Sequence, residues 1–173
     1  PMMNSSLAQD SGKGIAILLN SMDSSALTDG ITSQKEDKII FERGQKIDAY
    51  FKAKDLPLAG AGQKMAEEAY KHDIDWRLIP AIAMRESTGG KFACKSVPNS
   101  PFGWGSCKIG FETLDLAIEK VAFNLGGKNP KTASYYDGEL VEVLENYNGR
   151  AVPHYARDVI AIMNIIGDEK ELS

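Results

Sequence analysis

The stretch Asp75-Trp76-Arg77-Leu78-Ile79-Pro80-Ala81-Ile82-Ala83-Met84-Arg85-Glu86-Ser87 decides the fold, and Thr88-Gly89-Gly90 follows it. Residues 78–84 are almost all apolar, which predicts a helix buried at the centre of a core. Asp75 suits the N-cap of this helix, and the two glycines predict its end. Glu86 therefore lies at the C-terminal end of the most apolar helix in the chain.

Apolar positions recur at helical spacing in five further segments. The predicted helices span residues 36–54, 62–72, 114–125, 139–146 and 153–166. Between Gly89 and Gly110 the sequence is rich in Gly, Pro and aromatic residues instead. We expect this segment to form either a short β-hairpin or an irregular loop.

These segments predict a mainly α-helical domain over residues 36–167. Residues 1–35 are rich in Ser, Asp, Gly and Thr and are interpreted as an N-terminal arm, in which the apolar patch Ile15–Met22 forms a short helix. Residues 168–173 form a charged tail. The chain starts with Pro1 rather than Met, which we interpret as a trimmed N-terminus.

Composition excludes several classes of function. The chain has 173 residues, a net charge of −4 and a sequence pI near 5.3, so it lacks the basic character that nucleic-acid binding requires. No run approaches the roughly 18 apolar residues of a membrane span. Two cysteines are too few for a zinc ribbon, and His72 and His154 are expected to be surface groups at helix ends. We expect a monomer without metal or cofactor.

Glu86 is the candidate catalytic residue. A carboxyl group there lies near the negative end of a helix dipole and beside apolar surface. Both features disfavour the ionised form, which suits a general acid. The alternative is a solvated glutamate at a frayed helix end.

Three motifs, in this order, resemble those of the lysozyme-like superfamily, in particular soluble lytic transglycosylases and related bacterial endo-β-N-acetylglucosaminidases. Glu86-Ser87 is similar to their Glu-Ser pair. The segment Asn99-Ser100-Pro101-Phe102-Gly103-Trp104-Gly105-Ser106 is similar to the motif that lines their cleft. Glu145-Asn146-Tyr147-Asn148-Gly149 resembles their Tyr-Asn-Gly motif, and Tyr155 with Val159 matches their closing helix. The resemblance covers residues 55–166 and implies a lysozyme-like fold.

The resemblance also implies roles for individual residues. Glu86 becomes the catalytic acid, Tyr147 points at it, and Asn148 contacts sugar. Phe102 and Trp104 offer flat faces for sugar rings, although either one could instead anchor the loop. The remaining candidates for contact with substrate are Ser87 and Ser106.

The substrate implied is the glycan strand of peptidoglycan. Glycosidases that hydrolyse usually pair two carboxylates. No second acid is equally convincing: Glu112, Asp115 and Glu119 belong to a solvated helix face, and Asp137 and Glu145 are weaker candidates. A lytic transglycosylase needs only one acid and is therefore our leading interpretation, with cleavage between N-acetylmuramic acid and N-acetylglucosamine.

Two departures from the transglycosylase pattern keep other functions open. Phe102-Gly103-Trp104-Gly105 replaces the common Gly-Leu-Met-Gln and is closer to the glucosaminidases. Glu145 precedes Asn146 where many transglycosylases have Ala before Tyr-Asn. The alternatives are a hydrolytic endo-β-N-acetylglucosaminidase or muramidase, and a non-catalytic glycan-binding module.

Cys94 and Cys107 bracket the loop that carries Phe102 and Trp104. If the loop folds back on itself, the two cysteines can form a disulfide that closes about 14 residues and contributes ~3 kcal/mol. The alternative is two reduced thiols. A disulfide requires an oxidising compartment, so we expect a secreted protein or one of the cell envelope.

Overall fold

The computed structural model describes residues 24–148, 150 and 152–168, with side chains from residue 31 onward. Contacts divide the chain into two compact units, residues 1–38 and residues 39–173. The second unit contains every residue of the candidate site. The apolar patch predicted at Ile15–Met22 lies outside the described residues.

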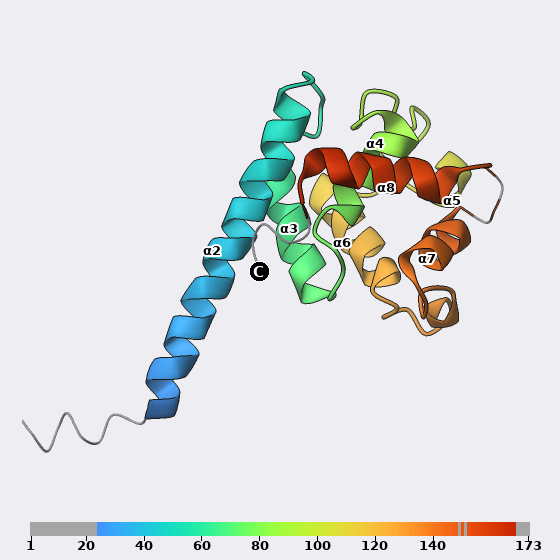
Figure 1. Ribbon diagram of the computed structural model, residues 1–173. Coiled ribbons are helices and arrows are strands. Elements are labelled where there is room, and N and C mark those ends of the chain that lie inside the picture. Colours follow the sequence, from blue (N-terminus) through green and yellow to red (C-terminus); the bar gives the residue numbers. More distant parts are fainter. Residues whose placement is uncertain (1–23, 149, 151, 169–173) are drawn as a thin grey trace, which may run out of the picture. The chain divides into compact units, whose positions relative to one another are not determined.

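The described residues form seven α-helices and one short 3₁₀ helix (Figure 1). They are α2 (Ser24–Lys52), α3 (Gly62–Lys71), α4 (Leu78–Ser87), α5 (Trp104–Cys107), α6 (Leu114–Leu125), η1 (Ala133–Tyr135), α7 (Leu140–Tyr147) and α8 (Tyr155–Ile166). No β-strand occurs in this part of the chain. The prediction of a mainly α-helical protein is confirmed.

The apolar periodicity located most helix boundaries well. Helix α6 begins and ends at the predicted residues, and the limits of α3, α7 and α8 fall within one or two residues of the prediction. Helix α2 is different, because it begins at Ser24 rather than at residue 36. Residues 31–35 of this helix are exposed, so their sequence carries no apolar stripe that would indicate a helix.

Helix α4 is the central helix of the second unit. All residues from Leu78 to Ala83 are buried, and α3, α6 and α8 pack against this helix (Figure 1). Immediately before it, the Asp75 carboxylate accepts a hydrogen bond of 2.9 Å from the backbone N–H of Arg77. Thr88 adopts a left-handed conformation with φ of 52° and ends the helix. Glu86 is thereby held on the last turn of a rigid, buried element.

The segment between α4 and α6 forms an irregular loop, and the alternative of a β-hairpin is not realised among its described residues. Asn99 and Gly103 have positive φ angles of 46° and 64°, which are incompatible with extended strands. The short element α5 is a tight turn rather than a regular helix, because Gly105 and Ser106 inside it also have positive φ. The loop therefore has no ladder of backbone hydrogen bonds and depends on other restraints for its shape.

The expectation that His72 lies at the surface is wrong. It is 9% exposed, and its Nε2 atom lies 3.4 Å from Oε2 of Glu68, which is buried one turn earlier on α3. The ring also meets Phe123 of α6 edge to face, with 5.9 Å between centroids. The polar partner and the aromatic neighbour together allow the imidazole to be buried. His154 is exposed, as expected.

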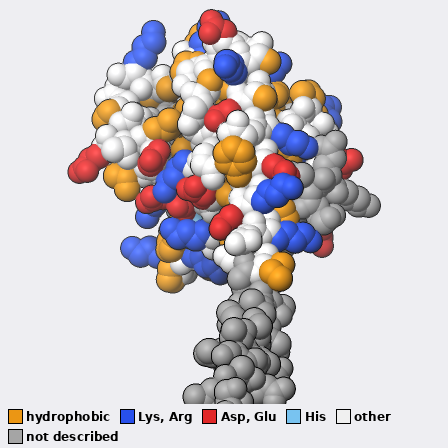
Figure 2. Space-filling view, turned by 90° about the vertical axis from the view of Figure 1, so that its left-hand side faces the viewer, with side chains coloured by type: hydrophobic (Ala, Val, Ile, Leu, Met, Phe, Trp, Pro, Cys, Tyr) orange, Lys and Arg blue, Asp and Glu red, His pale blue; other side chains and the backbone are white. Residues whose placement is uncertain are grey.

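No helix in the described ranges combines the length and the apolar character needed to cross a bilayer. Figure 2 shows basic and acidic side chains mixed over one face of the molecule, with isolated hydrophobic groups among them. That face carries no broad patch of a single charge. A mixed distribution of this kind is usual for a protein surface.

Candidate active site

The candidate site is built around the carboxyl group of Glu86, which lies where α4 ends. Glu86 is solvent-exposed, although the rest of its helix is mostly buried. The hydroxyl of Tyr155, in the first turn of α8, donates a hydrogen bond of 2.5 Å to Oε1 of this carboxyl group. The acid is thus accessible to a ligand and fixed in orientation at the same time.

Tyr155 is a buried residue at 4% exposure, and its ring stacks on that of Tyr147 with 6.3 Å between centroids. Burial and the charge of Glu86 raise the pKa of both tyrosine hydroxyls. Both groups therefore keep their protons at ordinary pH and act as hydrogen-bond donors. The pair forms a wall beside Glu86, contributed by α7 and α8.

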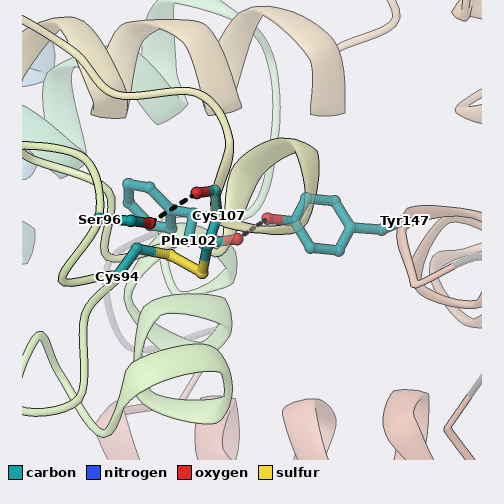
Figure 3. Close-up of a disulfide and its surroundings, with 5 residues drawn as sticks. All are labelled: Cys94, Ser96, Phe102, Cys107 and Tyr147. Carbon is teal, nitrogen blue, oxygen red and sulfur yellow. Dashed lines mark hydrogen bonds between the residues drawn. A yellow bond between two sulfur atoms is a disulfide. The ribbon is translucent and has the colours of Figure 1, made fainter.

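The resemblance implies that Tyr147 points at Glu86, but the tyrosine that bonds to the Glu86 carboxyl group is Tyr155. The Tyr147 hydroxyl donates to the carbonyl oxygen of Phe102 at 3.3 Å (Figure 3). Tyr147 is at the end of α7, from which its ring reaches the loop, whereas Tyr155 is on α8, which packs along α4. Tyr147 thus joins α7 to the loop, and Tyr155 holds the acid.

Gly103 brings the loop backbone against the second oxygen of the carboxyl group. A Cβ atom added at Gly103 would lie 3.3 Å from Oε2 of Glu86. The φ angle of Gly103 is 64°, in the left-handed region that favours glycine. Both the backbone conformation and the close approach to Glu86 therefore favour glycine here.

The predicted disulfide between Cys94 and Cys107 is present, with 5.4 Å between Cα atoms (Figure 3). Close to it, the Ser96 hydroxyl donates a hydrogen bond of 2.9 Å to the Cys107 carbonyl oxygen. The disulfide closes the loop that contains Gly103. This covalent link restrains the loop that meets Glu86, together with the buried side chain of Phe102 and the hydrogen bond from Tyr147.

Two predicted contact residues point inward. Phe102 is only 2% exposed and belongs to the core, so it anchors the loop and does not offer a face to a sugar ring. Ser87 is also buried, because its hydroxyl donates to the carbonyl oxygen of Ala83 at 3.2 Å and accepts from the N–H of Gly90 at 3.0 Å. Ser87 thus stabilises the end of α4. Neither side chain is available to a substrate.

The remaining predicted contact residues are more accessible. Trp104 is partly exposed and packs against the edge of the core, and Ser106 is exposed. Asn148 follows α7 and lines a cavity of about 590 Å³ between α7 and α8, together with Tyr155. Glu86 does not line this cavity. Trp104 and Ser106 thus belong to the loop, whereas Asn148 belongs to the cavity that Tyr155 lines.

The other candidate acids either form ion pairs or are exposed. Glu119 forms an ion pair of 2.6 Å with Lys64 on α3, and Glu145 pairs with Arg150 at 3.6 Å. Glu112, Asp115 and Asp137 are exposed. In the part of the chain that the structure describes, Glu86 is the acid joined to the tyrosine pair.

Sequence reasoning missed three residues that the structure adds to the site. They are Tyr155, Arg85 and Asp158. Tyr155 was noted only as part of a helix motif, and its position on the apolar face of α8 is typical of a core residue. Arg85 and Asp158 lie on different helices, so no local pattern indicates that they meet.

No family model matches the chain, and no curated protein or solved structure matches it either.

Proposed function

We propose that this protein cleaves the glycan strand of peptidoglycan between N-acetylmuramic acid and N-acetylglucosamine, with Glu86 as its single acid and base. In this proposal the helical domain is lysozyme-like and the enzyme is a lytic transglycosylase, which leaves 1,6-anhydromuramyl ends. The observation that carries the proposal is the hydrogen bond of 2.5 Å from the Tyr155 hydroxyl to an exposed Glu86 carboxyl group.

In the first step, protonated Glu86 donates its proton to the glycosidic oxygen, and the bond from this oxygen to the anomeric carbon of N-acetylmuramic acid breaks. The N-acetyl group of the same sugar stabilises the positive charge that develops at the anomeric carbon. In the second step, ionised Glu86 removes the proton of the 6-hydroxyl, whose oxygen then bonds to the anomeric carbon. The acid is regenerated, and no water is consumed.

Tyr155 supports both steps by holding Oε1. Its hydroxyl donates to the carboxylate that exists between the two steps, and hydrogen bonds to charged groups are the stronger ones. Oε2 remains on the side of the Gly103 backbone, where the absence of a side chain leaves room next to it. In this proposal, Oε1 is held by Tyr155 and Oε2 transfers the proton.

A hydrolytic endo-β-N-acetylglucosaminidase is the second candidate, favoured by the sequence Phe102-Gly103-Trp104-Gly105. Hydrolysis with retained or inverted configuration usually needs a second carboxylate close to the first. Glu119 and Glu145 are each engaged in an ion pair, which favours the transglycosylase, since it needs no second acid.

The cell envelope or the extracellular space is the compartment that fits this activity. The disulfide supports this location, since such bonds persist in oxidising surroundings. The substrate is found there as well.

The experiment is a digestion of purified peptidoglycan followed by mass spectrometry of the released fragments. We expect fragments that end in 1,6-anhydromuramic acid. Fragments with reducing ends would replace the transglycosylase with a hydrolase. Binding to insoluble peptidoglycan without release of fragments would instead indicate a non-catalytic glycan-binding module.

A further inference from the structure

Arg85, the residue before Glu86, reaches the same tyrosine that holds the acid. Its guanidinium carbon lies 5.6 Å from the centroid of the Tyr155 ring. A cation at this distance over an aromatic face is attracted by the electrons of the ring. Arg85 and Glu86 are neighbours in sequence, so α4 contacts Tyr155 through two consecutive residues, one at the ring and one at the hydroxyl.

Asp158 forms an ion pair with this guanidinium, although Nε of Arg85 makes no hydrogen bond. Its Oδ2 atom lies 3.6 Å from Nε of Arg85, and Asp158 is in the first turn of α8, three residues after Tyr155. About a third of each side chain is exposed, at 32% and 35%. An ion pair of this exposure contributes little to stability by itself. The pair nevertheless places a carboxylate beside the guanidinium that lies over the Tyr155 ring.

Arginine has the shape that this arrangement requires. Its planar guanidinium can direct an edge toward a carboxylate while it presents a face to an aromatic ring. The positive charge of Arg85 also acts to lower the pKa of the Tyr155 hydroxyl, against the larger effects of burial and of Glu86, which raise it. A less basic phenol oxygen is a better hydrogen-bond donor, so the charge of Arg85 strengthens the bond from Tyr155 to Glu86.

We propose that Arg85 is a positioning residue, which with Asp158 fixes the Tyr155 ring so that its hydroxyl stays on Glu86. The catalytic consequence rests on the proposed function, whereas the effect on the tyrosine does not. Arg157 provides a matched control: its side chain is 69% exposed, and its Nη2 atom lies 3.0 Å from Oδ1 of Asp158, whereas Arg85 meets the other oxygen, Oδ2.

The test is a double-mutant cycle on the digestion of soluble peptidoglycan fragments, with Arg85→Gln, Tyr155→Phe and the double variant. We expect Arg85→Gln to lower kcat about tenfold with little change in KM, and to change kcat less than about twofold when Tyr155 is already Phe. Arg157→Gln should match the wild type. Asp158→Asn keeps Arg85 but removes the charge of its ion-pair partner, and it should behave as Arg85→Gln does. An equal loss in both tyrosine backgrounds, or an equal loss in Arg157→Gln, would overturn the proposal.

A second measurement does not depend on activity. In protein labelled with ¹³C at tyrosine Cζ, the Tyr155 resonance should shift in Arg85→Gln and in Asp158→Asn but not in Arg157→Gln. If the wild type releases no glycan fragments, the proposed function fails while this shift still tests the positioning. An unchanged Tyr155 resonance in a folded Arg85→Gln variant would overturn the positioning, whatever the activity.

Discussion

The hydroxyl of Tyr155 lies 2.5 Å from Oε1 of Glu86, and this bond joins the first turn of α8 to the last turn of α4. The two residues are 69 positions apart in sequence. The long contact between α4 and α8 brings them together, so the packing of the core itself sets the orientation of the candidate acid.

Replacement of Tyr155 by Phe removes this bond and leaves the ring in place. We expect kcat for peptidoglycan to fall about ten- to a hundredfold, the range that corresponds to a hydrogen bond to a charged group. Steady-state kinetics of fragment release measure the effect. Tyr135→Phe, at an exposed tyrosine on η1, is the control and should keep the activity of the wild type. A Tyr155→Phe variant with full activity would remove Tyr155 from the site.

Replacement of Gly103 by Ala tests the close approach of the loop to Glu86. The added methyl group meets a φ of 64° and an oxygen at 3.3 Å, so we expect a loss of stability of about 1–2 kcal/mol together with a clear loss of activity. Gly60→Ala is the matched control, because Gly60 has a φ of 100° and no atom within 4 Å of the added Cβ. That variant should lose stability and keep its activity. Equal activities in the two variants would contradict a role for Gly103 beside the acid.

Reduction of the disulfide should loosen the loop. The two cysteines are 13 positions apart, and the chain-entropy relation gives a loss of ~3 kcal/mol for a loop of this length. Thermal unfolding with and without a thiol reductant measures the change, and we expect a lower Tm in its presence. The double variant Cys94→Ser with Cys107→Ser should resemble the reduced protein and show no further response to reductant. A wild-type Tm that does not change on reduction would contradict the claim that the disulfide stabilises the protein.

The buried tyrosines predict a loss of stability at alkaline pH. Burial raises the pKa of Tyr147 well above its ordinary value of 10.0 in the folded state, whereas the unfolded chain ionises near that value. The stabilisation is therefore fully present below pH 10 and is lost as the pH rises above it, at about 1.4 kcal/mol per pH unit for one group. Urea unfolding from pH 8 to 11 should show a steeper decline for the wild type than for Tyr147→Phe. Parallel declines would contradict the assignment to Tyr147.

Much of the fold could be predicted from the sequence, because the spacing of apolar residues indicates which face of a helix is buried. The run from Leu78 to Met84 located the central helix, and the pattern of α6 gave both of its ends. The start of α2 could not be predicted, because residues 31–35 are exposed and bury no apolar face. The loop was placed correctly by its Gly and Pro content, but its left-handed turns depend on contacts that no local pattern describes.

The site was only partly predictable for a similar reason. The place of Glu86 at the end of an apolar helix could be predicted, because it is a local feature of the sequence. Tyr155 was matched only to the closing helix of the family, because a pattern of apolar residues does not show what a phenol hydroxyl contacts. Ser87 and Phe102 were expected to face a ligand, but both are buried: Ser87 bonds to the backbone at the end of α4, and Phe102 packs in the core.

The most direct test of the central claim is the activity of Glu86→Gln, which keeps the shape of the side chain and cannot donate or accept the catalytic proton. On purified peptidoglycan, the wild type and the control variant Glu112→Gln, at an exposed acid outside the site, should release anhydromuramyl fragments at similar rates. The Glu86→Gln variant should release almost none while it remains folded. Release at the wild-type rate by Glu86→Gln would contradict the account.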